Sequence, residues 1–282
     1  MENHRYFCIR GFMKSGTNWL GSLLSSHESI SVVGEYHWQR ILEPLFANFK
    51  SEAVFHDEAY RNAARTKFDE MVKSCLASAA EPNSILVGER TPHTLAPVVL
   101  RDAPHVSIVR DGRDVLVSRA FHLYNEPQVH RLFTRIPAMA ETLKHFQADP
   151  WFFQNNPDQL LCHETMVRES MIWWRDHLKS DRETVKKNPK MKVKFVKYEE
   201  LHRDTQGVRA ELFDFLGVDP KRCAEIEGHL KPGFEKERPT EFLRKGVVGD
   251  WVNYFTDDTK KWFKDEAGEE LITQGYVADG GW

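Results

Sequence analysis

The sequence predicts an α/β fold of the P-loop type, in which helices flank a single wound parallel sheet. Short apolar runs alternate with longer segments that have helical spacing, and this alternation is typical of a parallel sheet. Glycine and basic residues gather just after two of the apolar runs, where the carboxyl ends of parallel strands form ligand sites. A chain of 282 residues can bury a large core, so we expect one domain over residues 1–282.

Strands are expected where an apolar run is too short, and too rich in β-branched residues, to form a helix. The first such run lies close to the N-terminus and leads into a loop that contains glycine. The run H-V-S-I-V precedes Arg110. A further strand-like segment follows the first helix. The four predicted strands are 5–10, 84–88, 105–109 and 192–197.

Helices are expected where apolar residues recur three and four positions apart. One helix begins directly after the first glycine loop, and another begins after Asp111-Gly112. Trp173 and Trp174 have apolar neighbours at helical spacing, which predicts that this helix packs in the core. The predicted helices are 17–26, 38–49, 57–80, 112–124, 130–147, 164–180, 206–216 and 256–270.

The segment at 121–160 differs from its surroundings because aromatic residues lie there between chain-breaking pieces. One piece is Asn125-Glu126-Pro127, and the other is the stretch 149–157 with its two prolines. Phe121 and Tyr124 are among its aromatic residues. We expect this segment to form a lid or acceptor wall within the same domain.

The loop G-F-M-K-S-G-T-N-W-L, residues 11–20, follows the first predicted strand and opens the first predicted helix. Gly11 and Gly16 allow a tight turn and a close approach of the backbone to a ligand. The amides around Ser15, Gly16 and Thr17 are expected to point at an anion above the helix N-terminus. A nucleotide phosphate or a sulfate fits such a loop.

The spacing of this loop is close to that of a Walker A loop, G-x-x-x-x-G-K-[ST]. Thr17 and Asn18 stand where a Walker loop has its lysine and its magnesium-binding hydroxyl, and the lysine lies inside the loop as Lys14. A lysine at that place would meet the bridging oxygen of a leaving group. The missing Lys-[Ser/Thr] pair argues against Mg-ATP as the ligand.

Residues 105–119, H-V-S-I-V-R-D-G-R-D-V-L-V-S-R, predict a second anion site at a strand end. Arg110 would end the strand, and Ser118 would lie eight residues later in the following helix. The two side chains are expected to lie close together. Arg113 and Arg119 are interpreted as solvated charges on the surface of that helix.

Two later segments carry further motifs. Residues 244–256 read R-K-G-V-V-G-D-W-V-N-Y-F-T, where Arg244, Lys245 and the Gly246 amide suit a terminal phosphate. Residues 195–201 read F-V-K-Y-E-E-L and contain Tyr198 at a strand end.

These four segments together resemble sulfotransferases that use PAPS (3'-phosphoadenosine 5'-phosphosulfate). Their usual forms are P-K-S-G-T-T-W, R-[N/D]-x-[K/R]-D-x-x-V-S, Y-E-[D/E]-[L/M] and R-K-G-x-x-G-D-W-K-N-x-F-T, and Val252 departs from the last. The resemblance implies that Arg110, Ser118, Arg244, Lys245 and Gly246 bind the 3'-phosphate and that Tyr198 lies by the adenine. It also implies that the 5'-phosphosulfate loop is formed by Lys14, Ser15, Gly16, Thr17, Asn18 and Trp19.

The resemblance implies in-line sulfuryl transfer from PAPS to a hydroxyl of a small-molecule acceptor. A base would take the acceptor proton, and Lys14 would stabilise the charge that develops on the leaving 3',5'-ADP. This scheme requires no metal. The sequence does not identify the acceptor.

Three residues are candidates for the base. Cytosolic members of the family use a histidine in K-T-H, and this chain has R-T-P-H with one extra residue before His93. Other sulfotransferases have a glutamate after a glycine at about the position of Glu35 in G-E-Y-H. Glu89 in G-E-R-T-P resembles a glutamate of heparan-type enzymes. Glu35 and His93 are the two leading candidates, and Glu89 is the third.

Composition limits the partners and the compartment. A net charge of −3 with 29% charged residues argues against nucleic acid as the main partner. The four cysteines are isolated in the sequence, which favours a reducing compartment without zinc. The first strand begins within a few residues of the N-terminus, and no long apolar run follows. We therefore expect a cytoplasmic protein without a membrane span, and a homodimer is compatible with the sequence.

Two other functions remain open at the level of sequence. A P-loop nucleotide kinase or other phosphotransferase would explain the first loop but gives no reason for a 3'-phosphate site. A non-catalytic nucleotide-binding protein would keep the donor motifs without turnover. Binding of 3',5'-ADP against ATP-Mg separates the first alternative from a sulfotransferase, and turnover separates the second.

Overall fold

The α/β fold class predicted from the sequence is confirmed in a computed structural model that describes residues 4–51, 57–129, 131–234 and 236–282. The chain divides into two compact units. The sheet unit contains Met1–Phe12, Gly16–Val109 and Lys179–Leu230, and the helical unit contains Met13–Ser15, Arg110–Leu178 and Lys231–Trp282.

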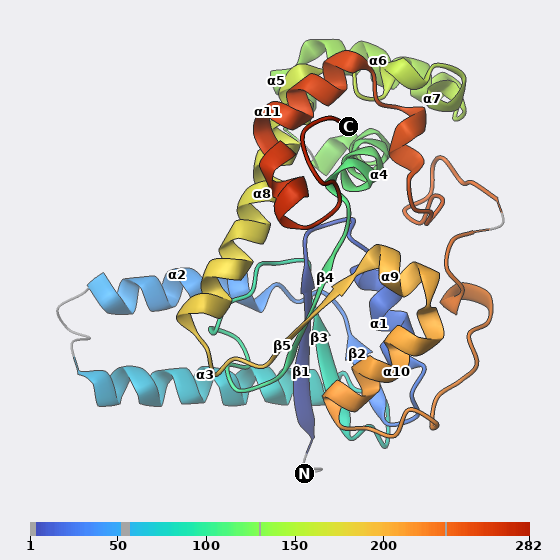
Figure 1. The fold of residues 1–282 in the computed structure, drawn as a ribbon. Helices are drawn as coiled ribbons and strands as arrows, with labels where there is room; N and C mark the ends of the chain where they lie inside the picture. Colours follow the sequence, from blue (N-terminus) through green and yellow to red (C-terminus); the bar gives the residue numbers. More distant parts are fainter. Residues whose placement is uncertain (1–3, 52–56, 130, 235) are drawn as a thin grey trace. The chain divides into compact units, whose positions relative to one another are not determined.

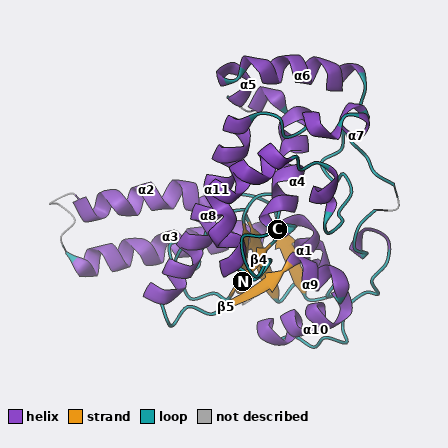
Figure 2. Ribbon diagram, turned by 45° about the horizontal axis from the view of Figure 1, so that its top comes forward, coloured by secondary structure: helices purple, strands orange, loops and turns teal. Residues whose placement is uncertain are grey.

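A five-stranded parallel sheet forms the centre of the sheet unit, with the strand order β2-β3-β1-β4-β5 (Figures 1 and 2). The register pairs Cys8 with Glu89 near the end of β3 and with His105 at the start of β4, so the three central strands are staggered, and because they are parallel their carboxyl ends point to the same edge. The strands are β1 (Arg5–Gly11), β2 (Ile30–Val33), β3 (Leu86–Arg90), β4 (His105–Val109) and β5 (Val193–Lys197).

Helices cover both faces of this sheet because successive side chains of a strand point to opposite faces. Phe7 and Ile9 pack with helices α1 (Thr17–Ser25), α9 (Tyr198–Arg203) and α10 (Thr205–Leu216) on one face. Cys8 packs with helices α2 (Trp38–Ser51) and α3 (Glu58–Ser78) on the other (Figure 1). Full burial of one such apolar side chain contributes about 1.5–3 kcal/mol to folding.

Side-chain caps explain where several helices begin. Asp57 accepts a hydrogen bond from the Ala59 amide at the start of α3, and Asp204 accepts one from the Gly207 amide at the start of α10. Helix α10 ends at Gly217, whose φ of 71° is left-handed. These caps satisfy backbone groups that a helix end leaves without partners.

The described residues of the helical unit form helices and loops without a strand (Figure 2). Phe153 lies at the centre of an aromatic cluster, with ring centroids 4.8 Å from Tyr124, 5.0 Å from Phe146 and 5.6 Å from Phe121. The α-helices are α4 (Gly112–Asn125), α5 (Leu132–Arg135), α6 (Pro137–Ala148), α7 (Phe152–Asn155), α8 (Glu164–Lys187, of which the residues to Leu178 belong to this unit) and α11 (Asp257–Thr273). Short 3-10 helices are η2 (Pro127–Val129), η3 (Pro157–Gln159) and η5 (Asp250–Asn253), with η4 (Gly228–Leu230) in the sheet unit.

The helix predicted at 130–147 is wrong, because the structure has α5 and α6 there. Proline lacks an amide hydrogen and disfavours helical backbone in the residue before it. Ile136, which precedes Pro137, accordingly has φ −123° and ψ 85°, and α6 begins at the proline. Residue 130, where the predicted helix starts, lies outside the described residues.

Three strands or α-helices lie outside the predicted ranges, namely β2, α7 and α9, whereas β3 is shifted by two residues and α8 is longer than predicted. Strand β2 corresponds to the strand-like segment noted after the first helix, and α9 begins at Tyr198 directly after β5. Strand β3 runs to Arg90, because the backbone pairing with β1 continues to the partners Ile9 and Arg90. Helix α8 continues to Lys187 with charged residues, where apolar periodicity no longer indicates a helix. Apolar spacing is a weak signal in such solvent-facing turns, because few of their side chains are buried.

Candidate functional site

The loop after β1 has the backbone geometry that its glycines predict. Gly11 has φ 149° and Gly16 has φ 99°. A Cβ atom on Gly11 would lie 2.5 Å from the carbonyl oxygen of Ile108, and one on Gly16 would lie 2.7 Å from the ring of Tyr198. Both positions therefore require glycine. Lys14 also has a left-handed φ, 67°, which is uncommon for a residue with a side chain.

The N-terminus of α1 is open to an anion. Gly16 is the N-cap and provides no side-chain hydrogen bond, and the first turn contains no acidic residue. The Ser15 side chain is buried, and its hydroxyl has no hydrogen-bond partner among the described residues. Because buried hydroxyls are normally hydrogen-bonded, and helix N-termini attract anions, these groups suit the oxygens of a phosphate or sulfate. Thr17, buried, and Asn18, half-buried, follow in the first turn.

Trp19 and Tyr198 form an aromatic pair in the sheet unit. Their ring centroids lie 5.5 Å apart with the rings edge to face. The Trp19 indole donates a hydrogen bond of 2.9 Å to the carbonyl oxygen of Leu230, which fixes the ring. Tyr198 is buried against the glycine of the loop. Flat rings next to a phosphate loop can pack against a nucleotide base.

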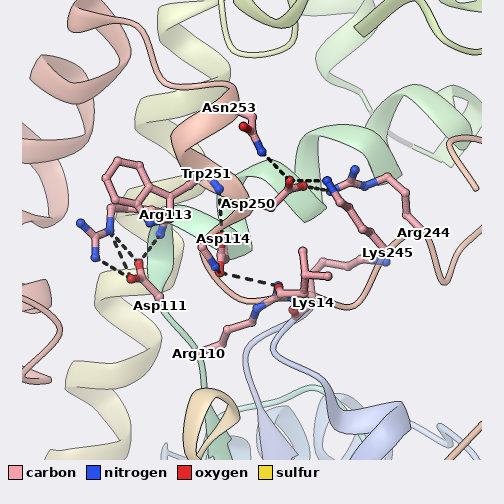
Figure 3. Close-up of polar contacts among 12 residues, drawn as sticks. Lys14, Arg110, Asp111, Arg113, Asp114, Arg244, Lys245, Asp250, Trp251 and Asn253 are labelled. Atoms are coloured by element: carbon pink, nitrogen blue, oxygen red, sulfur yellow. Dashed lines mark hydrogen bonds and ion pairs between the residues drawn. The ribbon is translucent and has the colours of Figure 1, made fainter. Parts of the chain in front are cut away.

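Arg110 connects the loop after β1 with the segment 244–256 inside the helical unit (Figure 3). Its Nη1 donates to the carbonyl oxygen of Lys14 at 3.1 Å, and its Nη2 donates to that of Val247 at 2.8 Å. The Asp114 carboxylate lies 3.9 Å from Nη2. A largely buried guanidinium thus lies where two of the sequence motifs meet. Ser118 is half-buried further along α4.

Asp114 anchors the segment 244–256 to α4 (Figure 3). Its carboxylate accepts the Gly249 amide at 2.7 Å and the Trp251 amide at 3.0 Å. Burial raises the pKa of Asp114, and Arg110 and these amides partly offset that rise. No role was predicted for Asp114 from the sequence, although it occupies the aspartate position of the motif R-[N/D]-x-[K/R]-D.

Arg244 and Lys245 are held by carboxylates in this structure. The Arg244 guanidinium contacts both Glu237 and Asp250, and Lys245 Nζ lies 2.7 Å from Asp250 Oδ1 (Figure 3). Burial acts to raise the pKa of Asp250, but Arg244 and Lys245 outweigh it, and the net shift is downward. Gly246 follows with a left-handed φ of 67°. Glu237 belongs to no motif, and its role here could not be read from the sequence.

The Lys14 ammonium packs on an aromatic ring. Its Nζ lies 3.6 Å from the centroid of the Phe242 ring, a distance at which the ring face attracts a cation. Phe242 is half exposed. No sequence motif indicated this neighbour.

The interpretation of Arg113 and Arg119 as solvated charges is wrong, because both are buried. Arg113 pairs with Asp111 at 2.7 Å, and its guanidinium lies 4.1 Å from the Trp251 ring centroid. Arg119 donates from Nε to Ser170 Oγ at 3.0 Å, and burial lowers its pKa to about 10. Almost every side of α4 is covered by packed residues, which periodicity along one helix cannot reveal.

Glu35 lies two residues after β2 and is exposed. Its Oε2 is 4.0 Å from Nε2 of His37, and His37 has a left-handed φ of 52°. A carboxylate in this setting is accessible to an acceptor hydroxyl.

His93 is half-buried after β3, and its ring has a defined hydrogen bond. Its Nδ1 accepts the Thr94 amide at 3.1 Å. A neutral imidazole that accepts at Nδ1 carries its proton on Nε2. The Gly11 amide donates to the His93 carbonyl oxygen at 3.4 Å, which holds this segment beside the end of β1.

Glu89 is fully buried in the sheet unit. One of its oxygens contacts the Arg10 guanidinium and the other accepts the Thr91 hydroxyl. Arg10 is buried as well and also donates to the carbonyl oxygen of Ile9 at 3.0 Å. One carboxylate oxygen is therefore engaged in a buried ion pair and the other in a hydrogen bond.

Comparison with known proteins identifies the family of this chain. A family model described as "Sulfotransferase domain" matches residues 5–273. The chain belongs to the sulfotransferase family. The family recognised from the four motifs is therefore confirmed. This sulfotransferase contains, among its described residues, no helix that is long and apolar enough to cross a membrane, and no group of three or more His, Cys, Asp or Glu side chains placed to hold a metal.

Several similar proteins are sulfotransferases. Sulfotransferase 2B1 of Homo sapiens is 30% identical over 118 residues, which cover 36% of this sulfotransferase and 32% of the relative. Sulfotransferase 2A1 of Homo sapiens is 25% identical over 282 aligned residues, which cover 93% of this chain and 84% of the relative. The sulfotransferase thus spans about a third of the length of the first curated relatives it matches.

Solved structures of similar proteins agree on the fold. Mouse sulfotransferase SULT7A1 in complex with PAP has a TM-score of 0.52 at 19% identity, covering 98% of this sulfotransferase and 86% of that chain. The sulfotransferase domain from the curacin biosynthetic pathway has a TM-score of 0.50 at 14% identity, and the match covers 98% of this chain and 99% of that domain. At such low identity these neighbours show the fold alone.

Proposed function

We propose that this member of the sulfotransferase family moves a sulfuryl group from PAPS to a hydroxyl of a small-molecule acceptor by in-line transfer. The observation that carries the proposal is Arg110, which hydrogen-bonds the carbonyl oxygens of both Lys14 and Val247. A buried cation is thereby fixed between the loop that carries Lys14 and the segment that carries Arg244 and Lys245. A kinase has no need of this second cationic segment.

The proposed donor contacts follow the chemistry of each group. Amides at the N-terminus of α1 and the Ser15 hydroxyl suit the 5'-phosphosulfate, and the ring of Tyr198 suits the adenine. Lys14 would stabilise the leaving 3',5'-ADP. The residues proposed for the loop are Lys14, Ser15, Gly16, Thr17, Asn18 and Trp19, and those for the 3'-phosphate are Arg110, Ser118, Arg244, Lys245 and Gly246.

The local geometry favours Glu35 over the other two candidates as the base. Glu89 has both oxygens engaged by Arg10 and Thr91. His93 accepts a backbone amide at Nδ1, so a neutral ring would have to change tautomer before Nε2 could take a proton. The exposed carboxylate of Glu35 needs no such change. His93 stays the second candidate.

The acceptor class and the compartment are further parts of the proposal. The formal net charge of −3 favours a small-molecule acceptor over nucleic acid. The four cysteines are free thiols, as a reducing compartment favours. Burial raises the pKa of Cys8 to about 12, so this thiol stays protonated. Whether the protein is a homodimer stays a prediction.

Binding and transfer assays test the proposal. Calorimetric titration should give tighter binding of 3',5'-ADP than of ATP-Mg, because Thr17 and Asn18 replace the Walker lysine and magnesium-binding hydroxyl. Transfer of labelled sulfate from PAPS to members of a hydroxyl-compound panel should then identify acceptors. Tighter binding of ATP-Mg would favour the phosphotransferase alternative. Tight 3',5'-ADP binding without transfer to any acceptor would favour the non-catalytic one.

A further inference from the structure

A polar cavity lies beside α1 within the sheet unit. Its volume is about 320 Å³, which is large enough for a small organic ligand. Arg90 at the end of β3 forms one side of it, and serine residues on one face of α1 form another. The side chain of Arg90 packs against Gly21 of α1, and a Cβ atom added to Gly21 would lie 3.2 Å from Arg90 Cδ. The cavity therefore lies on the face of the sheet that α1 covers.

Arg90 supplies a cation that lacks a partner within the described residues. Its Nε is buried without a hydrogen bond, and no carboxylate forms an ion pair with its guanidinium. A half-buried guanidinium loses part of its hydration and gains from an anion that replaces it. The buried arginines Arg10 and Arg209 of the same unit both have polar partners, which are the Glu89 carboxylate for Arg10 and the Ala224 carbonyl oxygen and Gln206 for Arg209.

The other walls of the cavity do not neutralise this charge. None of the lining residues, all of them described, is Asp or Glu. Ser22 and Ser26 donate their hydroxyl hydrogens to backbone carbonyl oxygens of α1. Ser25 differs, because its Oγ accepts the Val32 amide at 3.1 Å, which leaves its hydroxyl hydrogen for a ligand. The cavity therefore offers a guanidinium and a hydroxyl donor to one anion, and His229 also lines it.

The charge and the shape of the Arg90 guanidinium favour a carboxylate as the ligand of this cavity. One guanidinium balances a single negative charge, and its planar fork matches the two oxygens of a carboxylate. A phosphate monoester, with close to two charges at neutral pH, would remain half neutralised. Val32 and Leu230 provide apolar wall for the rest of an organic molecule.

We propose that this cavity binds the carboxylate of a small organic acid, with Arg90 as the cation and Ser25 as a hydrogen-bond donor. The site is formed by side chains other than those proposed for PAPS. Its existence does not depend on sulfuryl transfer.

The test uses the full chain with 3',5'-ADP at saturation, so that anions cannot bind at the donor loop. Benzoate, its uncharged analogue benzyl alcohol and inorganic phosphate are titrated by calorimetry into the wild type, Arg90→Gln and Arg40→Gln. Arg40 is exposed on α2, at the other face of the sheet, and its variant removes the same charge. We expect saturable benzoate binding that Arg90→Gln weakens by about tenfold or more, that Arg40→Gln leaves unchanged, and that benzyl alcohol does not reproduce.

The proposal is overturned if benzoate does not saturate, if Arg90→Gln binds it as well as the wild type, or if benzyl alcohol or inorganic phosphate binds more tightly. Retained binding of 3',5'-ADP shows that a variant is folded. If Arg90→Gln does not fold, Ser25→Ala carries the test, and unchanged benzoate affinity in that variant contradicts the assignment. If the protein transfers sulfate but does not bind benzoate, the carboxylate site is rejected and the proposed sulfotransferase function is kept.

Discussion

At the scale of single residues, the loop at 11–20 combines an uncommon backbone conformation with a lysine whose ammonium packs on an aromatic ring. Lys14 has a left-handed φ of 67° and its ammonium lies on the ring of Phe242. Holding a residue with a side chain in this conformation costs about 1 kcal/mol or more. Such strain at a site is maintained by the surrounding contacts, here the hydrogen bond from Arg110 to the Lys14 carbonyl oxygen.

Replacement of Lys14 should separate catalysis from binding. Lys14→Ala is expected to lower kcat by about 10²–10³-fold, because the charge on the leaving group develops only in the transition state. The Kd of 3',5'-ADP should rise much less. Steady-state kinetics and calorimetry measure the two quantities, with the exposed Lys67→Ala as the matched control. Equal losses in kcat and in donor affinity would contradict the role given to Lys14.

The identity of the base should appear in pH–rate profiles of two variants. Glu35→Gln is expected to lower kcat by about 10²–10⁴-fold and to remove the acidic limb of the profile, because an amide cannot take the acceptor proton. His93→Ala is expected to change kcat by less than about tenfold. The reverse order would make His93 the base. If neither variant loses more than about tenfold, both assignments fail.

At the scale of elements, the segment 244–256 owes its position to α4 more than to its own secondary structure. It contains only the short helix η5, and Asp114 holds it through two backbone amides. One buried carboxylate thus orders a loop that carries Arg244 and Lys245. The spacing of the motifs along the chain does not predict these hydrogen bonds, although Asp114 and the segment 244–256 each belong to a motif.

Asp114→Asn should loosen this loop. An asparagine side chain has one oxygen, so it can accept from only one of the two amides and presents its own N–H groups to the other. The free energy of unfolding is expected to fall by about 1–3 kcal/mol, and 3',5'-ADP should bind more weakly. Denaturant unfolding and calorimetry measure these effects. Asp258→Asn, at an exposed position in the first turn of α11, is the control and should stay within about 0.5 kcal/mol.

At the scale of the whole molecule, buried ion pairs link stability to pH. Arg244 and Lys245 hold the pKa of Asp250 below its ordinary value of 3.8. A carboxyl group with a depressed folded-state pKa stabilises the fold fully above its unfolded pKa. That stabilisation is lost as the pH falls below 3.8 through the lower folded-state value.

Asp250→Asn should therefore change the acid limb of stability. The variant is expected to lose about 3 kcal/mol at neutral pH, because Arg244 keeps a buried charge with one carboxylate fewer. Below about pH 4 its stability should fall less steeply than that of the wild type. Unfolding free energies across this range provide the comparison, with exposed Asp257→Asn as control. Parallel curves for Asp250→Asn and wild type would contradict the assignment.

The sequence predicts the fold and the donor motifs because both depend on local signals. Gly11 and Gly16 are needed for a backbone that only glycine adopts easily, and that need is visible in the spacing of the loop. The burial of Arg113 and Arg119 depends on elements far away in the chain, and so does the contact of Glu237 with Arg244. Contacts between residues far apart in the chain produce no regular spacing of apolar residues, so the sequence pattern does not predict them. The break between α5 and α6 at Pro137, by contrast, is predictable from the proline itself. It was missed because apolar residues recur at helical spacing on both sides of the proline.

The pair of Arg10 and Glu89 has a consequence for how this chain can change over generations. Each charge lies in the interior of the sheet and faces the other, so a substitution of either alone would leave the remaining one without compensation. A simultaneous exchange of both for apolar residues of similar size need not carry that cost. Descendants that have lost the pair should therefore lack both members, and lineages with one of them alone should be rare.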